Sequence, residues 1–318
     1  MVGYTNRAFA RFSVEGFKTN AMYGLLKLFN RKDVSLDDTW VFAFDRFSAK
    51  KANSDTYKAN RPSAPNEYLL QSEQCEIGLR NSGFNVFAYN GLEADDIIAS
   101  LCENHYNDFD KIRIFSNDKD MAQLIDKEGK IELVGLLSNS VTITKDNFAD
   151  NLYSRKYIPF NTLLLYKSLV GDSSDEIKGI RGFGDAAFRN FLVQLEDDGY
   201  ILEDIRAKEQ ELEILHRYFA GEKLEQALES HHLARFVTTK AIKLQNLEFQ
   251  TERFSEFLSQ FRMKSVAKAT GVPYIENFNT SYLHELTGRY NEDFYKSKYP
   301  DGISVEIEID GIDKEYLY

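Results

Sequence analysis

The sequence predicts an α/β fold with a mainly parallel sheet flanked by helices, followed by a region of helices alone. From about residue 40 to residue 125, short apolar runs alternate with segments of helical periodicity, which is typical of βαβ units. Beyond about residue 152 the apolar positions follow a helical spacing only. A length of 318 residues accommodates one large domain or two modest ones.

The strands of the first half are short apolar runs. Residues 40–44 form a continuous apolar run, as expected of a parallel strand that is covered on both faces. The expected strands are 40–44, 84–88, 111–116, 130–134 and 140–144. The expected helices of this half are 16–32, 65–81, 93–106 and a short one at 118–124.

The second half carries helical patterns up to about residue 270. The expected helices are 159–170, 185–196, 202–220, 223–230 and 253–269. Near the end of the chain, apolar and acidic residues alternate at 305–309, which predicts a late strand.

Composition excludes several classes of protein. No apolar run is long enough for a transmembrane helix, and the start of the chain lacks the apolar core of a signal peptide. Cys75 and Cys102 lie in helical patterns, so we expect free buried thiols in a reducing cytoplasm. A net charge of −11, taken alone, argues against a nucleic-acid binder. The net charge is a sum over the whole chain, however, and acidic clusters that bind metals make it more negative.

Acidic side chains gather in four clusters, and each cluster follows a predicted strand end or a Gly-rich turn. Like charges repel, so such a gathering costs free energy unless cations neutralise it. In parallel sheets, sites form beyond the carboxyl ends of the strands, where three of the clusters are expected. The clusters therefore predict a pair of divalent metals such as Mg²⁺ or Mn²⁺, which cleave phosphodiesters. Their members are Asp45; Glu93, Asp95 and Asp96; Asp118 and Asp120; and Asp172, Asp175 and Glu176.

Each acidic cluster also has a structural interpretation. Glu93, Asp95 and Asp96 stand in the first turn of a predicted helix, where the helix dipole favours negative charge. Asp118 and Asp120 stand in a strand-to-helix turn, where aspartate is a common cap.

Residues 171–184 form the most specific segment, because they join Asp172 and Asp175 to the glycines Gly179, Gly182 and Gly184. Glycines before a helix present backbone N–H groups to a phosphate, which favours a functional role. The structural alternative is a tight helical hairpin that needs positive φ.

A basic stretch lies between the first predicted strand and the next helix. Lys50 and Lys51 precede Lys58 and Arg61. A solvated loop is the usual interpretation, but beside acidic clusters Lys58 and Arg61 could bind the scissile phosphate. Arg7 is a weaker candidate of the same kind.

Taken in order, these segments resemble the 5′-nuclease family of flap endonucleases and 5′–3′ exonucleases of phages and bacteria, which includes phage RNase H enzymes. The resemblance spans roughly residues 5–200 and rests on six pieces in the family's order. They are the motif at Arg7, Phe44–Asp45, 57–61, 93–96, 116–120 and 171–184.

The resemblance implies a PIN-like nuclease domain at 1–150, with a helical arch near 46–81. It implies a helical DNA-binding subdomain at 151–270, with a helix–three-turn–helix motif at 160–195. Residues 271–318 would form a C-terminal extension of unknown role.

The resemblance also implies roles for individual residues. Eight carboxylates would hold two Mg²⁺ or Mn²⁺ ions: Asp45, Glu93, Asp95, Asp96, Asp118, Asp120, Asp172 and Asp175. Lys58 would contact the scissile phosphate with Arg61 nearby, and K⁺ could sit at the Gly182–Gly184 turn. DNA would be contacted by Arg7, Lys50, Lys51, Lys178, Arg181, Gly182, Gly184 and Arg189.

The implied substrates are branched or 5′-flap DNA and RNA/DNA hybrids. A monomer in the cytoplasm of a bacterial cell or a phage-infected host is expected, with a separate polymerase or single-strand-binding protein as companion.

The chain departs from the family in two places. Family members open with an apolar strand that ends in Asp-Gly, which this sequence begins too late to supply, so we expect that strand and one metal-ligand aspartate to be absent. The phosphate-binding turn is usually followed by Pro-Lys-Thr, whereas Asp185 and Ala186 follow it here. Arg181 and Arg189 could compensate for the phosphate-binding lysine that is missing from this turn.

Because one metal-ligand aspartate is expected to be absent, a branched-DNA-binding module without catalysis is the alternative function. A PIN-type ribonuclease is a third interpretation, against which the 171–184 motif argues.

Overall fold

The structure is a computed structural model that describes residues 12–46, 50, 57–58, 60, 65–136, 140–152, 158–205 and 208–283. Four sequence predictions lie outside these residues: Arg7, Lys51, Arg61 and the strand at 305–309. Most of the expected arch segment before residue 65 also lies outside them.

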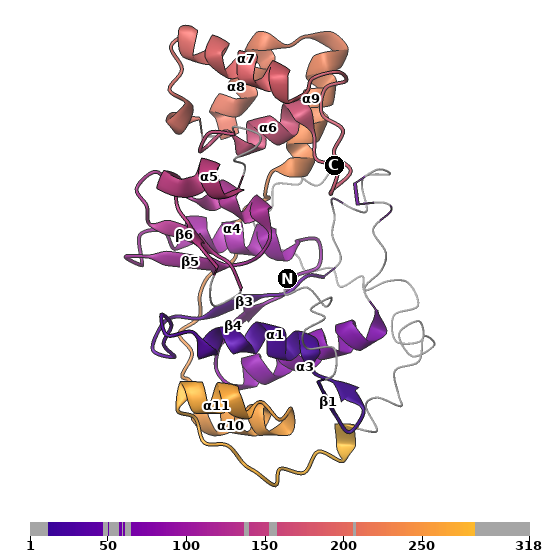
Figure 1. The fold of residues 1–318 in the computed structure, drawn as a ribbon, viewed down its shortest axis with the longest axis vertical. Helices are drawn as coiled ribbons and strands as arrows, with labels where there is room; N and C mark the ends of the chain where they lie inside the picture. The colour runs from indigo at the N-terminus through magenta and orange to yellow at the C-terminus, as the bar shows by residue number, and fades with distance from the viewer. Residues whose placement is uncertain are drawn as a thin grey trace.

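Paired parallel strands form the centre of the first half of the chain (Figure 1). β3 (Val41–Ala43) pairs in parallel with β4 (Asn85–Phe87), and β5 (Ile112–Phe115) pairs in parallel with β6 (Ile131–Val134). β7 (Thr142–Ile143) adds an antiparallel strand to β6. The predicted α/β class is confirmed. The sheet is in two pieces, however, because β3 and β5 are not hydrogen-bonded to each other.

Helices cover these strands. α1 (Asn20–Leu26), α3 (Asn66–Asn81) and α4 (Ala94–Asn104) begin or end within a few residues of the expected bounds. The helical pattern expected over 16–32, with Asn20 as a candidate cap, begins as a helix only at Asn20. Residues Ser13–Val14 (β1) and Phe17–Lys18 (β2) form a small hairpin instead, because Gly16 has φ +82° and turns the chain there.

The helical half lies at one end of the molecule in Figure 1. Its helices pack around a core that includes Phe188 and Leu165, both fully buried. The helices are α5 (Phe148–Leu152), α6 (Leu163–Val170), α7 (Asp185–Asp197), α8 (Lys208–Tyr218) and α9 (Gly221–Ala234). Short 3-10 turns precede two of them: η4 (Lys145–Asn147) comes before α5 and η5 (Leu202–Asp204) before α8, while η3 (Lys119–Leu124) lies between β5 and β6.

The chain then returns to the opposite end of the molecule (Figure 1). Residues 235–250 run along α4, where the Asn104 amide donates to the carbonyls of Thr239 (2.8 Å) and Ile242 (2.7 Å). The single helix expected at 253–269 is two helices, α10 (Thr251–Gln260) and α11 (Lys264–Thr270). They separate at Arg262, whose φ of +57° is incompatible with a continuing helix.

Gly179 closes the turn between α6 and α7, and its replacement tests how tightly that turn is packed. A Cβ there would lie 2.5 Å from the Gly171 nitrogen, and φ is +65°. Gly179→Ala is expected to cost about 3 kcal/mol of unfolding free energy. Gly182→Ala serves as control, since φ is also positive (+80°) but nothing lies within 4 Å. Its cost should be about 1 kcal/mol by denaturant unfolding. Equal costs for the two variants would contradict tight packing at Gly179.

Candidate metal centre

The carboxyl ends of the strands carry Asp45 and Asp118, as predicted. Asp45 follows β3, and its Oδ1 accepts from the Ala94 N–H at 2.9 Å, at the start of α4. Asp118 follows β5, and its Oδ1 accepts from the Asp120 N–H at 2.9 Å. Both carboxylates therefore act as helix caps, and both remain exposed to a ligand from solvent.

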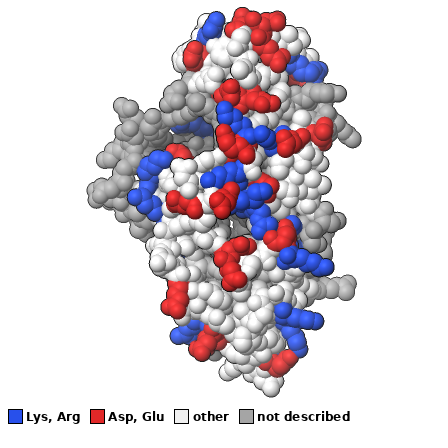
Figure 2. Space-filling view, turned by 90° about the vertical axis from the view of Figure 1, so that its left-hand side faces the viewer, with Lys and Arg blue, Asp and Glu red and all other residues white. Residues whose placement is uncertain are grey.

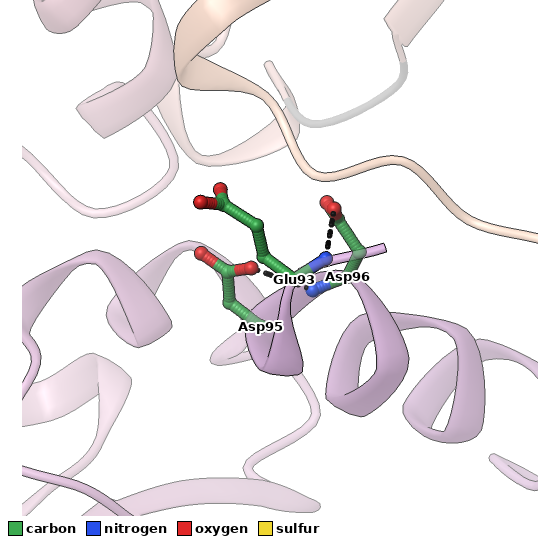
Figure 3. A group of neighbouring side chains, drawn as sticks. All are labelled: Glu93, Asp95 and Asp96. Carbon is green, nitrogen blue, oxygen red and sulfur yellow. Dashed lines mark hydrogen bonds between the residues drawn. The ribbon is translucent and has the colours of Figure 1, made fainter. Parts of the chain in front are cut away.

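Glu93, Asp95 and Asp96 form the first acidic group, with carboxylate oxygens within 4.8 Å of one another. Glu93 is the N-cap of α4, which explains how three acids fit on one turn. Figure 3 shows the carboxylates of Glu93 and Asp95 on one side, while Asp96 folds back towards the Glu93 N–H. Glu93 and Asp95 thus offer oxygens to the same space.

Asp96 is held by the protein on every side. Its Oδ1 accepts from Lys50 Nζ at 3.0 Å and from the Val237 N–H at 2.7 Å. Its Oδ2 accepts from the Glu93 N–H at 3.1 Å, and the residue is only 1% exposed. Asp96 therefore joins α4, the basic stretch and the segment that returns after α9.

Tyr57 and Lys58 connect the two acidic groups. Lys58 Nζ donates to both carboxylate oxygens of Glu93, at 2.9 and 3.0 Å, and Tyr57 Oη donates to one of them at 3.0 Å. The Lys58 N–H donates to the Asp175 carbonyl at 3.2 Å. The basic stretch thus reaches the acids, as the sequence predicts.

The second acidic group consists of Asp120, Asp172 and Asp175, again with oxygens within 4.8 Å. Two predicted clusters, far apart in the sequence, therefore meet. Lys167 of α6 lies between them: its Nζ is paired with Asp172 at 2.5 Å and also with Asp120. Lys167 is 3% exposed.

Lys167 was missed by the sequence reasoning. The available signal is one charged residue within the otherwise apolar helix 163–170, because a buried lysine needs an acidic partner.

Burial and these lysines shift the pKa values of the carboxyl groups. Burial, helped by the Asp96 charge, raises the pKa of Asp95 to about 7. Burial also raises the pKa of Asp120 to about 6, although Lys167 opposes it. Burial alone would raise the pKa of Asp172 too, but the charge and hydrogen bond of Lys167 hold it at about 2. Lys58 outweighs burial at Glu93 and lowers the pKa of that group.

The turn between α6 and α7 presents its basic side chains to solvent. Lys178, Arg181 and Arg189 are exposed, as are Gly182 and Gly184, the N-cap of α7. Figure 2 shows acidic and basic side chains interleaved over the middle of one face.

Glu176, the remaining acid of the predicted clusters, lies outside both acidic groups. Its carboxylate accepts from the backbone N–H of Asn60 at 3.0 Å and from the Asn60 side chain. It therefore fixes the basic stretch beside the second acidic group.

Comparison with known proteins identifies relatives of this chain. The sequence profile described as "5'-3' exonuclease, N-terminal resolvase-like domain" matches residues 2–153. A 5′–3′ exonuclease of Aquifex aeolicus is 30% identical over 264 residues, which cover 80% of this chain and 86% of that one. The chain belongs to the 5′–3′ exonuclease family.

Other similar proteins are longer or more distant. A DNA polymerase I of Caldicellulosiruptor bescii is 29% identical over 271 residues, which cover 82% of this chain and only 31% of that protein. The bacteriophage T5 flap endonuclease, in a complex with DNA and metal ions, is 15% identical with a TM-score of 0.48, covering 83% of this chain and 92% of that one.

Cys75 and Cys102 are buried thiols outside any disulfide, as predicted. Within the described part of the chain, every helix is too short or too polar to cross a membrane.

The raised pKa values predict how stability depends on pH in metal-free protein. Asp95, at about 7, and Asp120, at about 6, keep protons in the folded state that the unfolded chain releases near 3.8. The folded state binds more protons in that window, so stability should fall as the pH rises from about 4 to about 7. Thermal unfolding in EDTA at pH 5 and pH 8 measures this. Asp95→Asn should flatten the dependence; an unchanged slope would contradict burial of a protonated Asp95.

Proposed function

We propose that this protein is a metal-dependent, structure-specific 5′-nuclease that hydrolyses phosphodiesters in 5′-flap or nicked DNA. Membership of the 5′–3′ exonuclease family supports the reaction class. The observation that carries the proposal is the meeting of Asp120 with Asp172 and Asp175 across separate elements, beside Glu93 and Asp95. Such a gathering is stable only with cations between the acids.

The donor set fits hard divalent metals. All the candidate ligands are carboxylate oxygens, which Mg²⁺ and Mn²⁺ prefer. The proposed ligands are Glu93 and Asp95 in one group and Asp120, Asp172 and Asp175 in the other, with Asp45 and Asp118 at the exposed rim. Asp96 adds negative charge and holds Glu93 in place. When bound, such metals would activate a water and neutralise charge on the phosphate.

Lys58 is proposed to bind the scissile phosphate. Its ammonium already lies against Glu93 and over the Tyr57 ring, 4.6 Å from the centroid. A metal on Glu93 would compete for the same oxygens and release the lysine towards substrate, with Arg61 as its proposed companion. The lysine would then stabilise charge that develops on the phosphate.

The α6–α7 turn is proposed to hold the DNA backbone, with K⁺ a candidate ion at Gly182. Exposed Arg181 and Arg189 supply positive charge on either side of the turn. Replacing both with alanine should weaken duplex binding and flatten its salt dependence. RNA/DNA hybrids are further proposed substrates. A monomeric state, a cytoplasmic location and a separate polymerase or single-strand-binding companion belong to the same proposal. Arg7, Lys51 and Lys178 are proposed DNA contacts, whereas Lys50 is buried and its Nζ donates to Asp96 and to the Arg235 carbonyl, which corrects its prediction as a DNA contact.

Cleavage of a labelled 5′-flap duplex tests the function. Wild-type protein with Mg²⁺ should release the flap, and EDTA should stop it. The double variant Asp118→Asn with Asp120→Asn should bind the duplex but not cut it. Cleavage that survives the double change would defeat the proposed site.

One observation favours a second candidate, a branched-DNA-binding module without catalysis. Lys50, Lys58 and Lys167 already supply three positive charges to the six acids of the two groups, so part of the charge balance does not depend on metals. Tight flap binding without cleavage in either Mg²⁺ or Mn²⁺ would select that function.

A further inference from the structure

Helix α9 holds the turn between α6 and α7 through side chains on one of its faces. The Gln226 Oε1 accepts from the Arg181 N–H at 3.0 Å, and the Ser230 hydroxyl accepts from the Gly179 N–H at 3.0 Å. These two side chains are four positions apart, so they lie on the same face of the helix. The backbone of the turn is therefore fixed by a helix that follows it in the chain.

Glu222, one turn earlier on the same face, orients the Gln226 amide. Its Oε1 accepts from the Gln226 Nε2 at 2.9 Å. Because the amide nitrogen donates to Glu222, the amide oxygen is left to accept from Arg181. Ser230 is buried, whereas Gln226 is half-buried and meets the turn at its exposed side. Water can replace the Gln226 oxygen there, so this residue can be changed without leaving a buried N–H unpaired.

The C-terminal end of α9 contacts the element that carries Asp120. Ala234 is the last residue of the helix, and its carbonyl accepts from the Gln123 side-chain amide at 3.3 Å. Gln123 belongs to η3, which also contains Asp120. Ala234 shares a buried apolar cluster with Tyr57, whose hydroxyl donates to Glu93. This end of the helix therefore touches supports of both acidic groups.

The residues that directly follow α9 hold the first acidic group. Lys50 Nζ donates to the Arg235 carbonyl at 2.8 Å and to Asp96 at 3.0 Å. Two residues further on, the Val237 N–H donates to the same Asp96 oxygen at 2.7 Å. One continuous segment thus contacts the α6–α7 turn at its start and the acidic groups at its end.

A helix between two sites fixes the distance between them. The backbone rises about 1.5 Å per residue, so Gln226 and Ala234 are about 12 Å apart along the axis. Figure 1 shows α9 beside α6 in the helical half, and the two helices pack together. Tilting of α9 is therefore resisted by its packing, and stretching is resisted by its own hydrogen bonds.

We propose that α9 sets the position of the α6–α7 turn relative to the metal centre, and that Gln226 is a positioning residue that determines which phosphodiester is cut. The choice of phosphodiester rests on the proposed function, in which the turn holds the DNA backbone and the acids hold metals. The mechanical connection between the two ends of α9 does not rest on it. A misplacement of about 1 Å at a reacting centre can cost a hundredfold in rate. Loss of the Gln226 contact should therefore impair cleavage more than binding.

Single-turnover cleavage of a labelled 5′-flap duplex at saturating enzyme tests this role. Gln226→Leu should bind the duplex within about threefold of wild type, cut at least about tenfold more slowly and spread its products over neighbouring positions. Gln194→Leu makes the same change on the exposed side of α7 and should cut like wild type. Wild-type rate and cleavage position in Gln226→Leu would overturn the proposal.

An exchange of two side chains provides the rescue. In the double variant Glu222→Gln with Gln226→Glu, the carboxylate at position 226 can accept from the Arg181 N–H and from the new amide at position 222. The net charge is unchanged. This variant should restore a single cleavage position, and products as widely spread as those of Gln226→Leu would contradict the positioning role.

Hydrogen exchange in EDTA separates this inference from the proposed function. Binding of the duplex should slow exchange of the Val237 amide, beyond the far end of α9, in wild type but not in Gln226→Leu. If wild type binds the duplex without cutting it in Mg²⁺ or Mn²⁺, the proposed function fails and this measurement decides the inference alone. Equal exchange at Val237 in the two complexes would overturn the inference, and a wild type that binds no duplex would overturn both.

Discussion

Replacing Asp172 with asparagine is expected to lower the rate of flap cleavage by about a thousandfold, because the change removes a charged ligand worth several kcal/mol in the transition state. Two residues hold the Asp172 carboxylate within the second acidic group. Lys167 pairs with its Oδ2, and Ser174 donates to its Oδ1 through both its N–H (2.8 Å) and its hydroxyl (2.6 Å). An amide preserves the shape of the side chain but removes its charge.

The measurement is single-turnover cleavage of a 5′-flap duplex at saturating enzyme, together with calorimetric Mn²⁺ binding. Metal affinity should fall in parallel with the rate. Asp146→Asn is the matched control, since Asp146 is exposed in η4 and should change neither quantity. Full cleavage by Asp172→Asn, with normal metal affinity, would show that the second acidic group is not part of the metal centre.

Local patterns predicted which acids would matter. Asp45 and Asp118 follow strands, and strand ends are visible in the sequence as apolar runs that stop at a polar residue. Their convergence follows from a general property of parallel sheets. The meeting of Asp120 with Asp172 could be expected only through the family resemblance, because it depends on how α6 packs against η3.

The lysines that pair with these acids were harder to predict from the sequence. Lys50 reaches Asp96, and Lys167 reaches Asp120 and Asp172. The apolar helix around Lys167 indicates that this lysine is buried but does not identify its partners, and the polar stretch around Lys50 gives no such indication. The return of the chain along α4, through Val237 and Asp96, was also missed. The contact between Val237 and Asp96 joins residues 141 positions apart, and extended segments without periodicity carry no pattern that reveals their partners.

Replacing Lys167 is the second change for which we expect a large effect, here on the stability of the protein. In metal-free protein, Lys167→Met should lower the free energy of unfolding by about 3–5 kcal/mol, because it leaves the carboxylates of Asp120 and Asp172 buried without their cation. Burial opposes the charge on Lys167, but the two aspartates overcome it and raise the pKa of the lysine. The lysine is therefore charged at neutral pH and acts as a built-in counter-ion.

Divalent metal should rescue this variant more than it stabilises the wild type. In the wild type a metal must compete with Lys167 for the same oxygens, whereas in Lys167→Met it meets uncompensated carboxylates. At a hundredfold excess over its dissociation constant, Mg²⁺ adds about 2.7 kcal/mol to the folded state. Thermal unfolding with and without Mg²⁺ measures the difference.

Lys178→Met is the control for loss of a lysine, because Lys178 is exposed on the neighbouring turn and should be neutral in both conditions. A metal-free Lys167→Met as stable as wild type would mean that the carboxylates do not depend on this lysine. A loss of stability of the expected size, without extra rescue by Mg²⁺, would mean that the second acidic group holds a lysine but not a metal. Only destabilisation followed by enhanced rescue fits a site in which lysine and metal compete for one set of oxygens.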